Sequence, residues 1–262
     1  MSFDDYTSLS FERSPAGVLT VWLDRPESRN ATDRVMHGEL ARLWADIEGD
    51  DKVRAVLFAG RGEAFCAGGD LDLIEEQIAN FDLVVQMMDE ARAIVLGALD
   101  CPKPTVAAVH GSAVGAGLAL ALVADISIVA EDATLAEGHV RLGIAAGDHA
   151  VLLWPLLCGM AKAKYHLLTG APLTGLEAER IGLVSRSVPA EEVMAEATAI
   201  AEKLAAGSDT AIRWTRQALN QWYRVGLPAF ESSLAHEMLG FFGPDIQGRL
   251  DTLRARLRDD PS

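Results

Sequence analysis

The sequence predicts an α/β fold, and three observations support this prediction. The 262 residues are 50% hydrophobic and 23% charged, a composition typical of a globular protein with a large core. The first half alternates short apolar, β-branched runs with longer segments of helical periodicity. The second half shows helical periodicity almost throughout. Strands separated by helix-length connections pair in parallel with right-handed crossovers, so we expect a parallel sheet covered by helices.

The first half supplies most of the expected sheet. Thr32 is expected to cap a helix, because apolar residues between Val35 and Ile47 recur at helical spacing. The loop GRGEAFCAGGD leads into helical segments that end near Leu99, and a helix rich in glycine and alanine is expected from Gly115 to Ala124. The expected strands are Val18 to Asp24, Val53 to Ala59, Thr105 to Val109 and Ile126 to Ala130.

Beyond Asp148 we expect mainly helices, with one further strand from Leu183 to Val188. No repeat and no low-complexity linker separates the two halves, so these helices are expected to pack on the same body or on a neighbouring subunit. Near the end of the chain, four arginines alternate with leucines and acidic residues and predict a solvated helix face. The arginines are Arg249, Arg254, Arg256 and Arg258. The expected helices are Ala150 to Leu157, Ala161 to Leu168, Thr174 to Ile181, Ala190 to Ala206, Thr210 to Val225 and Leu227 to Phe242.

Charge, cysteine content and hydropathy exclude several classes of protein. The net charge of -15, from 23 basic and 38 acidic residues, repels nucleic acid, and no basic stripe offsets it. The three cysteines form no CxxC pair, and the acidic start MSFDDYTSLS does not resemble a secretory leader, so we expect a reducing, cytoplasmic location. The apolar run from Val106 to Ala124 is about as long as a membrane span. Because it contains His110, Ser112 and three glycines, we expect a buried strand and helix there, and no membrane association.

Common catalytic signatures are absent from the sequence. It has no GxSxG, Walker A, HExxH or complete GxGxxG motif, and its six histidines show no metal-ligand spacing, so no metal site is expected. A different theme occurs twice, in VLFAGRGEAFCAGGDL and in TVAAVHGSAVGAGLAL: a buried strand runs into a glycine-containing loop at the start of a helix. The first backbone amides of such a helix have no partner within the helix. Amides from two of these helix starts, aimed at one point, would form an oxyanion hole. The alternative is that small residues only allow tight packing between helix and sheet.

Several segments together resemble the crotonase superfamily, the enoyl-CoA hydratase/isomerase proteins. The resemblance spans about Val18 to Phe242 and rests on LDRPESRNAT, FCAGGDL, KPTVAAVHGSAVGAGLALALVADISI, ATLAEGHVRLGIAAG and LLTGAPLTGLEAERIGLVSRSV. It implies a spiral ββα core, assigned here to residues 1–195, and a C-terminal helical trimerisation region, residues 196–262. It also implies an acyl-CoA thioester substrate without a separate cofactor, since coenzyme A is part of the substrate, and a homotrimer or dimer of trimers.

The resemblance also assigns site residues. The amides of Gly69 and Ala116 fall on the oxyanion donors, although relatives usually have glycine at the second position, so a methyl group must fit there without a positive φ. Arg25, Arg29 and Lys103 are candidate contacts for the phosphates of coenzyme A. The residues expected to line the coenzyme A groove are Ser28, Arg29, Ala31, Ala67, Gly69, Asp70, Leu71 and Ala116.

The acid/base positions depart from the family pattern. Where hydratases of the family carry two glutamates, this sequence has Ala119 and His139. An imidazole titrates near neutrality, so His139 is a candidate acid or base, with a structural role as the alternative. Asp148 is a second candidate, with a helix N-cap as its alternative. Two further carboxylates, Glu137 and Glu237, are within conceivable reach.

The resemblance implies an enzyme of fatty acid metabolism that processes acyl-CoA through a thioester enolate, of the enoyl-CoA hydratase (lyase) or isomerase type. Two alternatives remain open because both glutamates are absent. In the first, His139 or Asp148 supports thioester hydrolysis, carbon–carbon cleavage or decarboxylation. In the second, the chain is a non-catalytic acyl-CoA binder.

Overall fold

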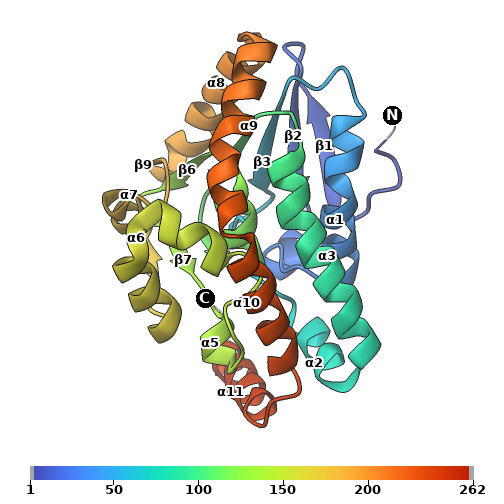
Figure 1. The fold of residues 1–262 in the computed structure, drawn as a ribbon, viewed down its shortest axis with the longest axis vertical. Helices are drawn as coiled ribbons and strands as arrows, with labels where there is room; N and C mark the ends of the chain where they lie inside the picture. Colours follow the sequence, from blue (N-terminus) through green and yellow to red (C-terminus); the bar gives the residue numbers. More distant parts are fainter. Residues whose placement is uncertain (1–2, 260–262) are drawn as a thin grey trace.

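The computed structural model describes residues 3–259 and shows a mixed α/β fold built on a six-stranded sheet (Figure 1). The strand order is β1–β2–β3–β4–β6–β9. The predicted parallel pairing is confirmed from β2 to β9, whereas β1 runs antiparallel to β2. The strands are β1 (Leu9–Arg13), β2 (Val18–Leu23), β3 (Ala55–Gly60), β4 (Thr105–Val109), β6 (Ile126–Ala130) and β9 (Arg186–Val188). The sequence did not predict β1, because this edge strand ends in exposed residues and lacks a continuous apolar run.

A small second sheet, which the sequence also did not predict, lies beyond the ends of the main strands. Its order is β5–β7–β8, and its members are β5 (Ser112–Val114), β7 (Thr134–Ala136) and β8 (Leu173–Thr174). Segments of two or three residues are too short to show a strand period. This sheet matters for the site because it ties the segment after β4 to the segment after β6.

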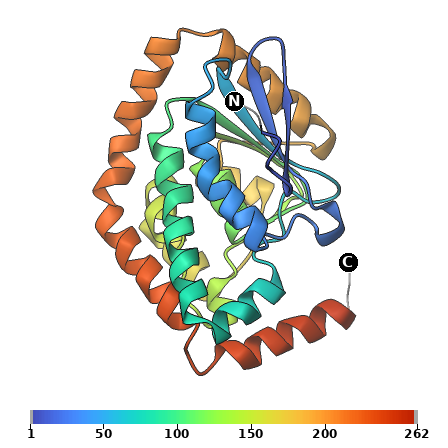
Figure 2. The ribbon, with the colours of Figure 1, turned by 90° about the vertical axis from the view of Figure 1, so that its right-hand side faces the viewer.

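Helices cover the main sheet on two sides. Figure 2 shows the sheet between α8 on one side and the pair α1 and α3 on the other. Helix α1 packs on the sheet through Trp44, whose ring meets that of Phe58 edge-on at 5.5 Å. The helices of the first half are α1 (Arg34–Glu48), α2 (Leu71–Ala79), α3 (Phe81–Asp100), α4 (Ala116–Val123) and α5 (His139–Leu142), and a short 3-10 turn spans Pro26–Ser28.

The start of α1 differs from the prediction. Asp33, not Thr32, is the N-cap, and its side chain accepts a 2.8 Å hydrogen bond from the Met36 amide. Val35, counted as part of the apolar face, is 50% exposed, and Met36 is buried in its place. Thr32 instead makes a tertiary contact, in which its amide donates a hydrogen bond to Gly68 O at 2.7 Å.

The second half is mainly helical, as predicted. It contains a 3-10 turn at Ala190–Glu192 and the helices α6 (Ala150–Thr169), α7 (Gly175–Ile181), α8 (Val193–Ala206), α9 (Asp209–Val225), α10 (Leu227–Gly240) and α11 (Ile246–Asp259). The two helices predicted on either side of Gly159 are the two arms of α6, which is kinked there. Helix α8 contains both residue 195 and residue 196 and packs on β3, β4 and β6. The division into 1–195 and 196–262 therefore stays a prediction.

Helix α11 is not the purely solvated face that its arginines suggested. It lies against α2 and α5 at the lower end of the molecule (Figures 1 and 2). Arg254 pairs with Asp72 and Glu75 of α2, and Arg249 donates to the Arg141 carbonyl. The apolar run from 106 to 124 forms β4, β5 and α4, and none of the helices within residues 3–259 is long and apolar enough to cross a membrane.

Candidate active site

Three loops meet at the carboxyl ends of β2, β3 and β4. Because these strands are parallel, the segments that follow them leave the same edge of the sheet. The middle segment, residues 66–70, lies between the other two. On one side it exchanges hydrogen bonds with Thr32, through Gly68 O and the Asp70 amide at 2.7 and 3.0 Å. On the other side, the Cys66 amide donates to Ser112 O at 2.9 Å.

Asn30 fixes the turn after β2. It is fully buried with a positive φ of 57°, a conformation that asparagine tolerates better than most residues. Its side chain accepts from the Arg25 amide at 2.9 Å and donates to the carbonyls of Arg61 and Ala64 at 2.8 and 2.9 Å. Sequence reasoning did not single out Asn30, although an asparagine in a turn after a strand is a recognisable signal.

Small residues let the second and third loops touch. Gly68 has a φ of +100°, and a Cβ there would lie 3.1 Å from Val114 O. A Cβ on Gly117 would lie 2.5 Å from that of Cys66, closer than packed side chains tolerate. Gly68 and Gly117 therefore serve tight packing, which is the alternative considered for the glycine-containing loops. The same packing brings the loop of Gly69 against the start of α4.

The two amides proposed as oxyanion donors lie in these contacting loops. Gly69 is exposed, and Ala116 is half-buried as the first residue of α4. Within residues 3–259, neither amide donates a hydrogen bond to another group of the chain. Gly115, directly before Ala116, has the positive φ of 46° in this turn. The φ of Ala116 is not positive, so the alanine backbone is not strained. Both amides are thus available at the same edge of the sheet.

Most of the expected groove residues lie in two segments that contact each other. Ser28, Arg29 and Ala31 form the turn after β2, and the Ala67 amide donates to Arg29 O at 3.0 Å. Asp70 caps α2 by accepting from the Asp72 amide at 2.9 Å, and Leu71 follows as the first helical residue. Exposed Arg29 remains a candidate phosphate contact.

Two other candidate phosphate contacts are corrected. Arg25 is occupied, because it donates to the Ala31 carbonyl and pairs with Asp33 at 3.3 Å and Asp70 at 3.6 Å. Lys103 precedes β4 and therefore lies at the amino ends of the parallel strands, whereas the site lies at their carboxyl ends. The length of β4, at about 3.3 Å per residue, separates the two. The place of Lys103 before the strand predicted at Thr105 to Val109 already indicated this end of the strand.

A buried cluster of two histidines and three carboxylates lies beside the start of α4. Glu137 directly follows β7, whose Ala136 carbonyl accepts the Gly115 amide at 3.0 Å. The five side chains come from the segment between β7 and the start of α5, the residues directly before α6 and the last turn of α10. Their exposed fractions are 1% for Glu137, 13% for His139, 14% for Asp148, 0% for His149 and 6% for Glu237.

The contacts in the cluster alternate between carboxylate and imidazole. His139 Nδ1 bonds to Glu137 Oε1, and His139 Nε2 lies 3.4 Å from Glu237 Oε1. His149 Nε2 lies 3.7 Å from Glu137 Oε2, and His149 Nδ1 bonds to Asp148 Oδ1 at 2.5 Å. Both candidates from the sequence, His139 and Asp148, are therefore in the cluster, together with the carboxylates Glu137 and Glu237.

The charges in the cluster shift the pKa values of its members. Burial by itself lowers the pKa of His139, but Glu137, Glu237 and Asp148 outweigh burial and raise that pKa well above 6.5. The pKa of His149 is also raised, because Asp148 and Glu137 outweigh burial. Burial would raise the pKa of Asp148, but the two histidines lower it. The pKa of Glu237 is raised by burial, which His139 offsets only in part.

The structure also shows the contacts of several other residues in this region. Asp148 is not an N-cap, since His149 occupies that position of α6 and Asp148 bonds to its ring. Sequence reasoning missed His149, although its place directly after a candidate aspartate was a signal. His110 bonds locally, with Nε2 2.9 Å from Gly62 O. The Cys66 thiol is fully buried, and burial raises its pKa, so it is not an activated nucleophile.

Metal binding was also considered for the cluster. Two sets of three donors each come within 4.8 Å: Glu137, Asp148 and His149, and His139, Asp148 and Glu237. However, every ring nitrogen of the two histidines faces a carboxylate oxygen. Ion pairing within the chain therefore accounts for the arrangement.

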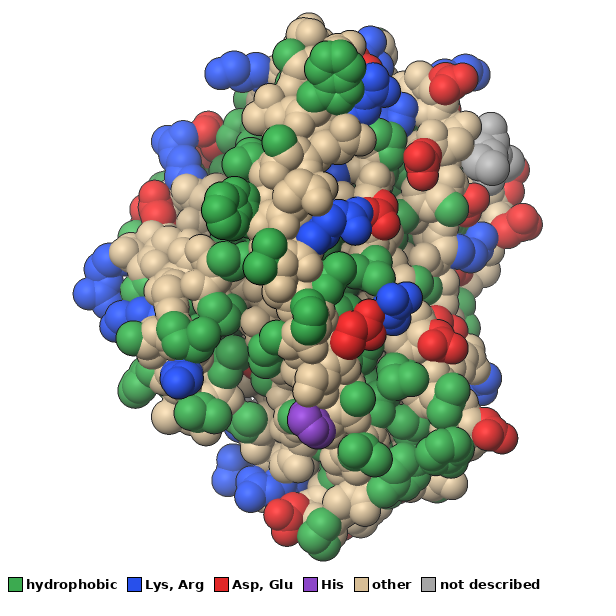
Figure 3. Space-filling model, in the orientation of Figure 1, with side chains coloured by type: hydrophobic (Ala, Val, Ile, Leu, Met, Phe, Trp, Pro, Cys, Tyr) green, Lys and Arg blue, Asp and Glu red, His purple; other side chains and the backbone are tan. Residues whose placement is uncertain are grey.

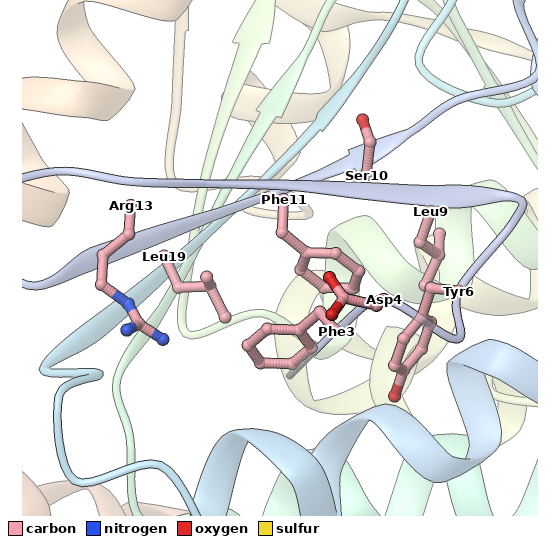
Figure 4. A pocket seen from close by; sticks show the side chains of 8 residues that line it. All are labelled: Phe3, Asp4, Tyr6, Leu9, Ser10, Phe11, Arg13 and Leu19. Carbon is pink, nitrogen blue, oxygen red and sulfur yellow. The ribbon is translucent and has the colours of Figure 1, made fainter. Parts of the chain in front are cut away.

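A pocket elsewhere on the molecule does not belong to this site. Figure 4 shows it at the edge strand β1, with a volume of about 470 Å³ and a lining of Phe3, Asp4, Tyr6, Leu9, Ser10, Phe11, Arg13 and Leu19. It contains no residue of the three loops or of the cluster. We assign the site from hydrogen bonding and charge rather than from this cavity.

Comparisons with known proteins identify relatives over most of the chain. The family model described as enoyl-CoA hydratase/isomerase matches residues 13–239. A relative from Thermus thermophilus named as an enoyl-CoA hydratase is 37% identical over 215 residues, covering 80% of this chain and 83% of its own. An enoyl-CoA hydratase/isomerase structure from Mycobacterium paratuberculosis superposes with a TM-score of 0.91 at 34% identity, over 95% of this chain and all of its own.

A further structural neighbour has a different activity. It is a β-diketone hydrolase from the cyanobacterium Anabaena, solved with (S)-3-oxocyclohexyl acetic acid bound. It superposes with a TM-score of 0.83 at 27% identity, over 92% of this chain and 96% of its own. The match of the family model and the extent of these similarities show that the chain belongs to the enoyl-CoA hydratase/isomerase family of the crotonase superfamily.

Proposed function

We propose that the protein is an acyl-CoA-processing enzyme that stabilises a thioester enolate between the Gly69 and Ala116 amides. One observation carries this proposal: two amides without a partner in the described chain lie in two loops that touch at one edge of the sheet. Each such donor stabilises a developing oxyanion by about 3 to 4 kcal/mol. The N-terminus of α4 adds positive potential at the same place. Family membership supports a thioester as the substrate.

The residues that surround the amides fit this substrate. The pantetheine arm would follow the groove between the Ser28–Ala31 turn and the segment from Ala67 to Leu71, and Arg29 would meet a phosphate. The cluster around His139 would handle the proton at the carbon next to the thioester carbonyl. The reaction would be of the lyase or isomerase type, in fatty acid metabolism and in the cytoplasm.

Calorimetry tests the binding part of this proposal. Coenzyme A and acyl-CoAs of short and long chain should bind to the wild type. Arg29→Ala should weaken binding by about tenfold, whereas Lys103→Ala, the matched control at the opposite edge of the sheet, should not. Absence of binding by every thioester would refute the proposal, as would equal effects of the two substitutions.

A second candidate function is hydrolytic carbon–carbon or thioester cleavage, or decarboxylation, supported by His139 or Asp148. Two observations favour it: imidazoles and carboxylates occupy the site, and a β-diketone hydrolase is among the structural neighbours. Mass spectrometry of products from a panel of enoyl-CoA, β-ketoacyl-CoA, malonyl-type thioesters and cyclic β-diketones would separate the candidates. Exclusive hydration of crotonyl-CoA would exclude the second candidate, and turnover of any thioester would exclude a mere acyl-CoA binder.

We also propose that the chain forms a homotrimer or a dimer of trimers. Four large apolar side chains of α9 are exposed in the single chain: Trp214, Leu219, Trp222 and Val225. Figure 3 shows apolar side chains gathered over α9 and at the lower ends of α3 and α10. An apolar surface of this kind usually marks an interface. Light scattering coupled to gel filtration gives the mass directly, and a monomer at micromolar concentration would contradict this.

A further inference from the structure

The five buried groups beside α4 form a chain of alternating carboxylates and imidazoles. Its order is Glu237, His139, Glu137, His149 and Asp148. Asp148, the last member, also lies close to Glu237, the first. One side-chain nitrogen or oxygen from each of Asp148, His139 and Glu237 lies within 4.8 Å of those of the other two. The arrangement is therefore a closed ring of charges, and the number of protons in it decides what the site can do.

The contacts favour protonation of both imidazoles on both nitrogens, although His149 Nε2 and Glu137 Oε2 are at an ion-pair distance and form no hydrogen bond. All four ring nitrogens face a carboxylate oxygen, at contacts up to 3.7 Å for His149. A neutral imidazole would direct the lone pair of one nitrogen at an acceptor oxygen, which is repulsive. For His139 Nε2 this also holds when Glu237 is protonated on Oε2, because Oε1, the oxygen that faces the ring, remains an acceptor. Each ring is therefore an imidazolium. His139 in this state has no free lone pair and cannot serve as the base that the sequence allowed.

The balance of charges then requires one more proton in the ring of five side chains. Two imidazolium ions face three carboxylates, and an uncompensated buried charge is costly. Glu137 contacts both rings, and Asp148 makes the 2.5 Å bond to His149. Glu237 has the least support as an anion, because its one histidine contact is 3.4 Å long and its Oε2 is buried without a hydrogen-bond partner in the described chain.

We propose that Glu237 holds the transferable proton of the site and acts as a positioning residue through His139, which remains an imidazolium. This inference rests on the proposed enolate chemistry. It agrees with the raised pKa of Glu237, for which burial is the main cause. The other charged groups that face the ring are those already named and, from α1, His37, which acts on Asp148.

The proton transfer balances without any further reactant. His139 Nε2–H gives its proton to the carbanionic carbon of the enolate, and the electron pair of the enolate forms the new C–H bond. Nε2 takes the carboxyl proton of Glu237 in return, which leaves a carboxylate beside an imidazolium. In the reverse direction, or from water between turnovers, the proton returns to Glu237. The net transfer is from a buried neutral acid to an anion held in the oxyanion hole.

The backbone beside Asp148 explains why Glu237 lies where it does. A Cβ on Gly147 would lie 2.6 Å from the Glu237 Cβ and 2.4 Å from Ser233 O, so only glycine lets α10 approach this loop. Ser233 Oγ reinforces the contact by donating to Gly147 O at 3.1 Å. The chain thus brings Glu237, remote in sequence, against the loop that carries Asp148 and His149.

Nuclear magnetic resonance can locate the proton without any substrate. Imidazole nitrogen shifts of His139 and His149 would be followed from about pH 6 to about pH 9, across the ordinary histidine range. If Glu237 is neutral near pH 7, Glu237→Gln removes no charge, and His139 stays an imidazolium there. Glu137→Gln removes a real charge and should lower the pKa of both rings. Equal lowering of the His139 pKa near neutrality by the two variants would overturn the protonation of Glu237.

Kinetics tests the transfer. Glu237→Gln should reduce kcat by about 10² to 10⁴ with little change in KM. We expect wild-type activity to fall as pH rises through the raised pKa of Glu237, and the variant should lack this fall. Glu237→Asp should restore part of kcat. Glu231→Gln, an exposed glutamate of the same helix paired with Arg92, is the control and should behave as wild type.

An unchanged kcat and pH profile in Glu237→Gln, with circular dichroism confirming the fold, would overturn the role in transfer. A wild type that turns over no thioester and no β-diketone would overturn the proposed function and, with it, the transfer step. The resonance experiment would still decide where the proton resides, so the two failures are distinguishable.

Discussion

Neither Gly69 nor Ala116 occupies a position that only glycine can fill. A Cβ on Gly69 would meet only Ile74 Cδ1, at an ordinary 3.6 Å, and Ala116 already carries a methyl group without backbone strain. Glycine is strictly required next to them, at Gly68, Gly115 and Gly117, where φ is positive or a neighbour is too close. What matters at the two donor positions is therefore the N–H group rather than the absence of a side chain.

Replacing Gly69 by proline tests this directly. Gly69→Pro deletes the N–H group and should lower kcat by about 10²- to 10³-fold, the usual effect of losing one oxyanion donor. Gly69→Ala keeps the N–H group and should retain most of the activity. Turnover of the best acyl-CoA substrate is the measurement, with circular dichroism to show that both variants fold. A proline variant with wild-type kcat would remove the Gly69 amide from the proposed mechanism.

Gly147 should be intolerant of any side chain. Gly147→Ala places a methyl group against Ser233 O and Glu237, and such overpacking typically costs about 1 to 3 kcal/mol. Gly248→Ala is the matched control, because nothing lies within 4 Å of a Cβ at that position of α11, and alanine should stabilise the helix by up to about 1 kcal/mol. Urea unfolding of both variants gives the free energies. Equal stability of the two would contradict the close approach of α10.

The residues of the acid/base cluster show how far sequence reasoning reached at this scale. His139 and Asp148 were predicted because a family pattern marks their positions. His149 was not predicted: its place directly after Asp148 was the one signal in the sequence, and its contact with Glu137 appears only in the fold. The protonation of the ring is also beyond sequence reasoning, since it follows from burial and from distances between residues up to a hundred positions apart.

At the scale of elements, α9 is attached to the core by one buried arginine. Arg216 donates to the carbonyls of Ala98 at 2.5 Å and of Cys101, at the end of α3, and pairs with Asp125 at 2.7 Å. The last carbonyls of a helix have no partner within the helix. Arg216 supplies one, and it thereby holds a C-terminal helix against the end of α3.

Removal of Arg216 should be costly. Arg216→Met leaves Asp125 and the carbonyls at the end of α3 without their partner, and breaking such a buried pair typically costs about 3 to 5 kcal/mol. Arg213→Met, on the exposed side of the same helix, should change stability by less than about 0.5 kcal/mol. Denaturant titration compares the two variants. A small loss in Arg216→Met would mean that the other contacts of α9, among them the Asn220 hydrogen bond to Leu99 O and the Arg224–Asp100 pair, suffice to hold it in place.

At the scale of the whole molecule, the buried ring links stability to pH. The folded-state pKa values of His139 and His149 are raised, so their contribution is complete below about pH 6.5, the ordinary histidine value, and is lost as pH rises through their folded values. The raised pKa of Glu237 acts in the same direction from about pH 4.3 upward. Asp148, whose pKa is lowered, contributes above about pH 3.9 and loses its contribution in acid.

Stability should therefore fall as pH rises from about 6 to about 9, by about 1.4 kcal/mol for each unit of raised histidine pKa within that window. His149→Gln should be less stable than wild type at about pH 6 and should show a shallower decline. Urea unfolding at both pH values measures the difference. Parallel declines in the two proteins would show that His149 is not charged by its neighbours in the folded state.

The sequence by itself determined the α/β class, most of the buried strands and the helical second half, because apolar periodicity is a property of neighbouring residues. Gly69, Ala116, His139 and Asp148 were named as candidates through the family resemblance. Tertiary structure alone decided that Asp33 and not Thr32 caps α1, and that Glu237 joins the cluster. Each of these depends on which segments the fold brings together, and hydrogen bonds and charges at 3 to 4 Å leave no trace in residues that are far apart along the chain.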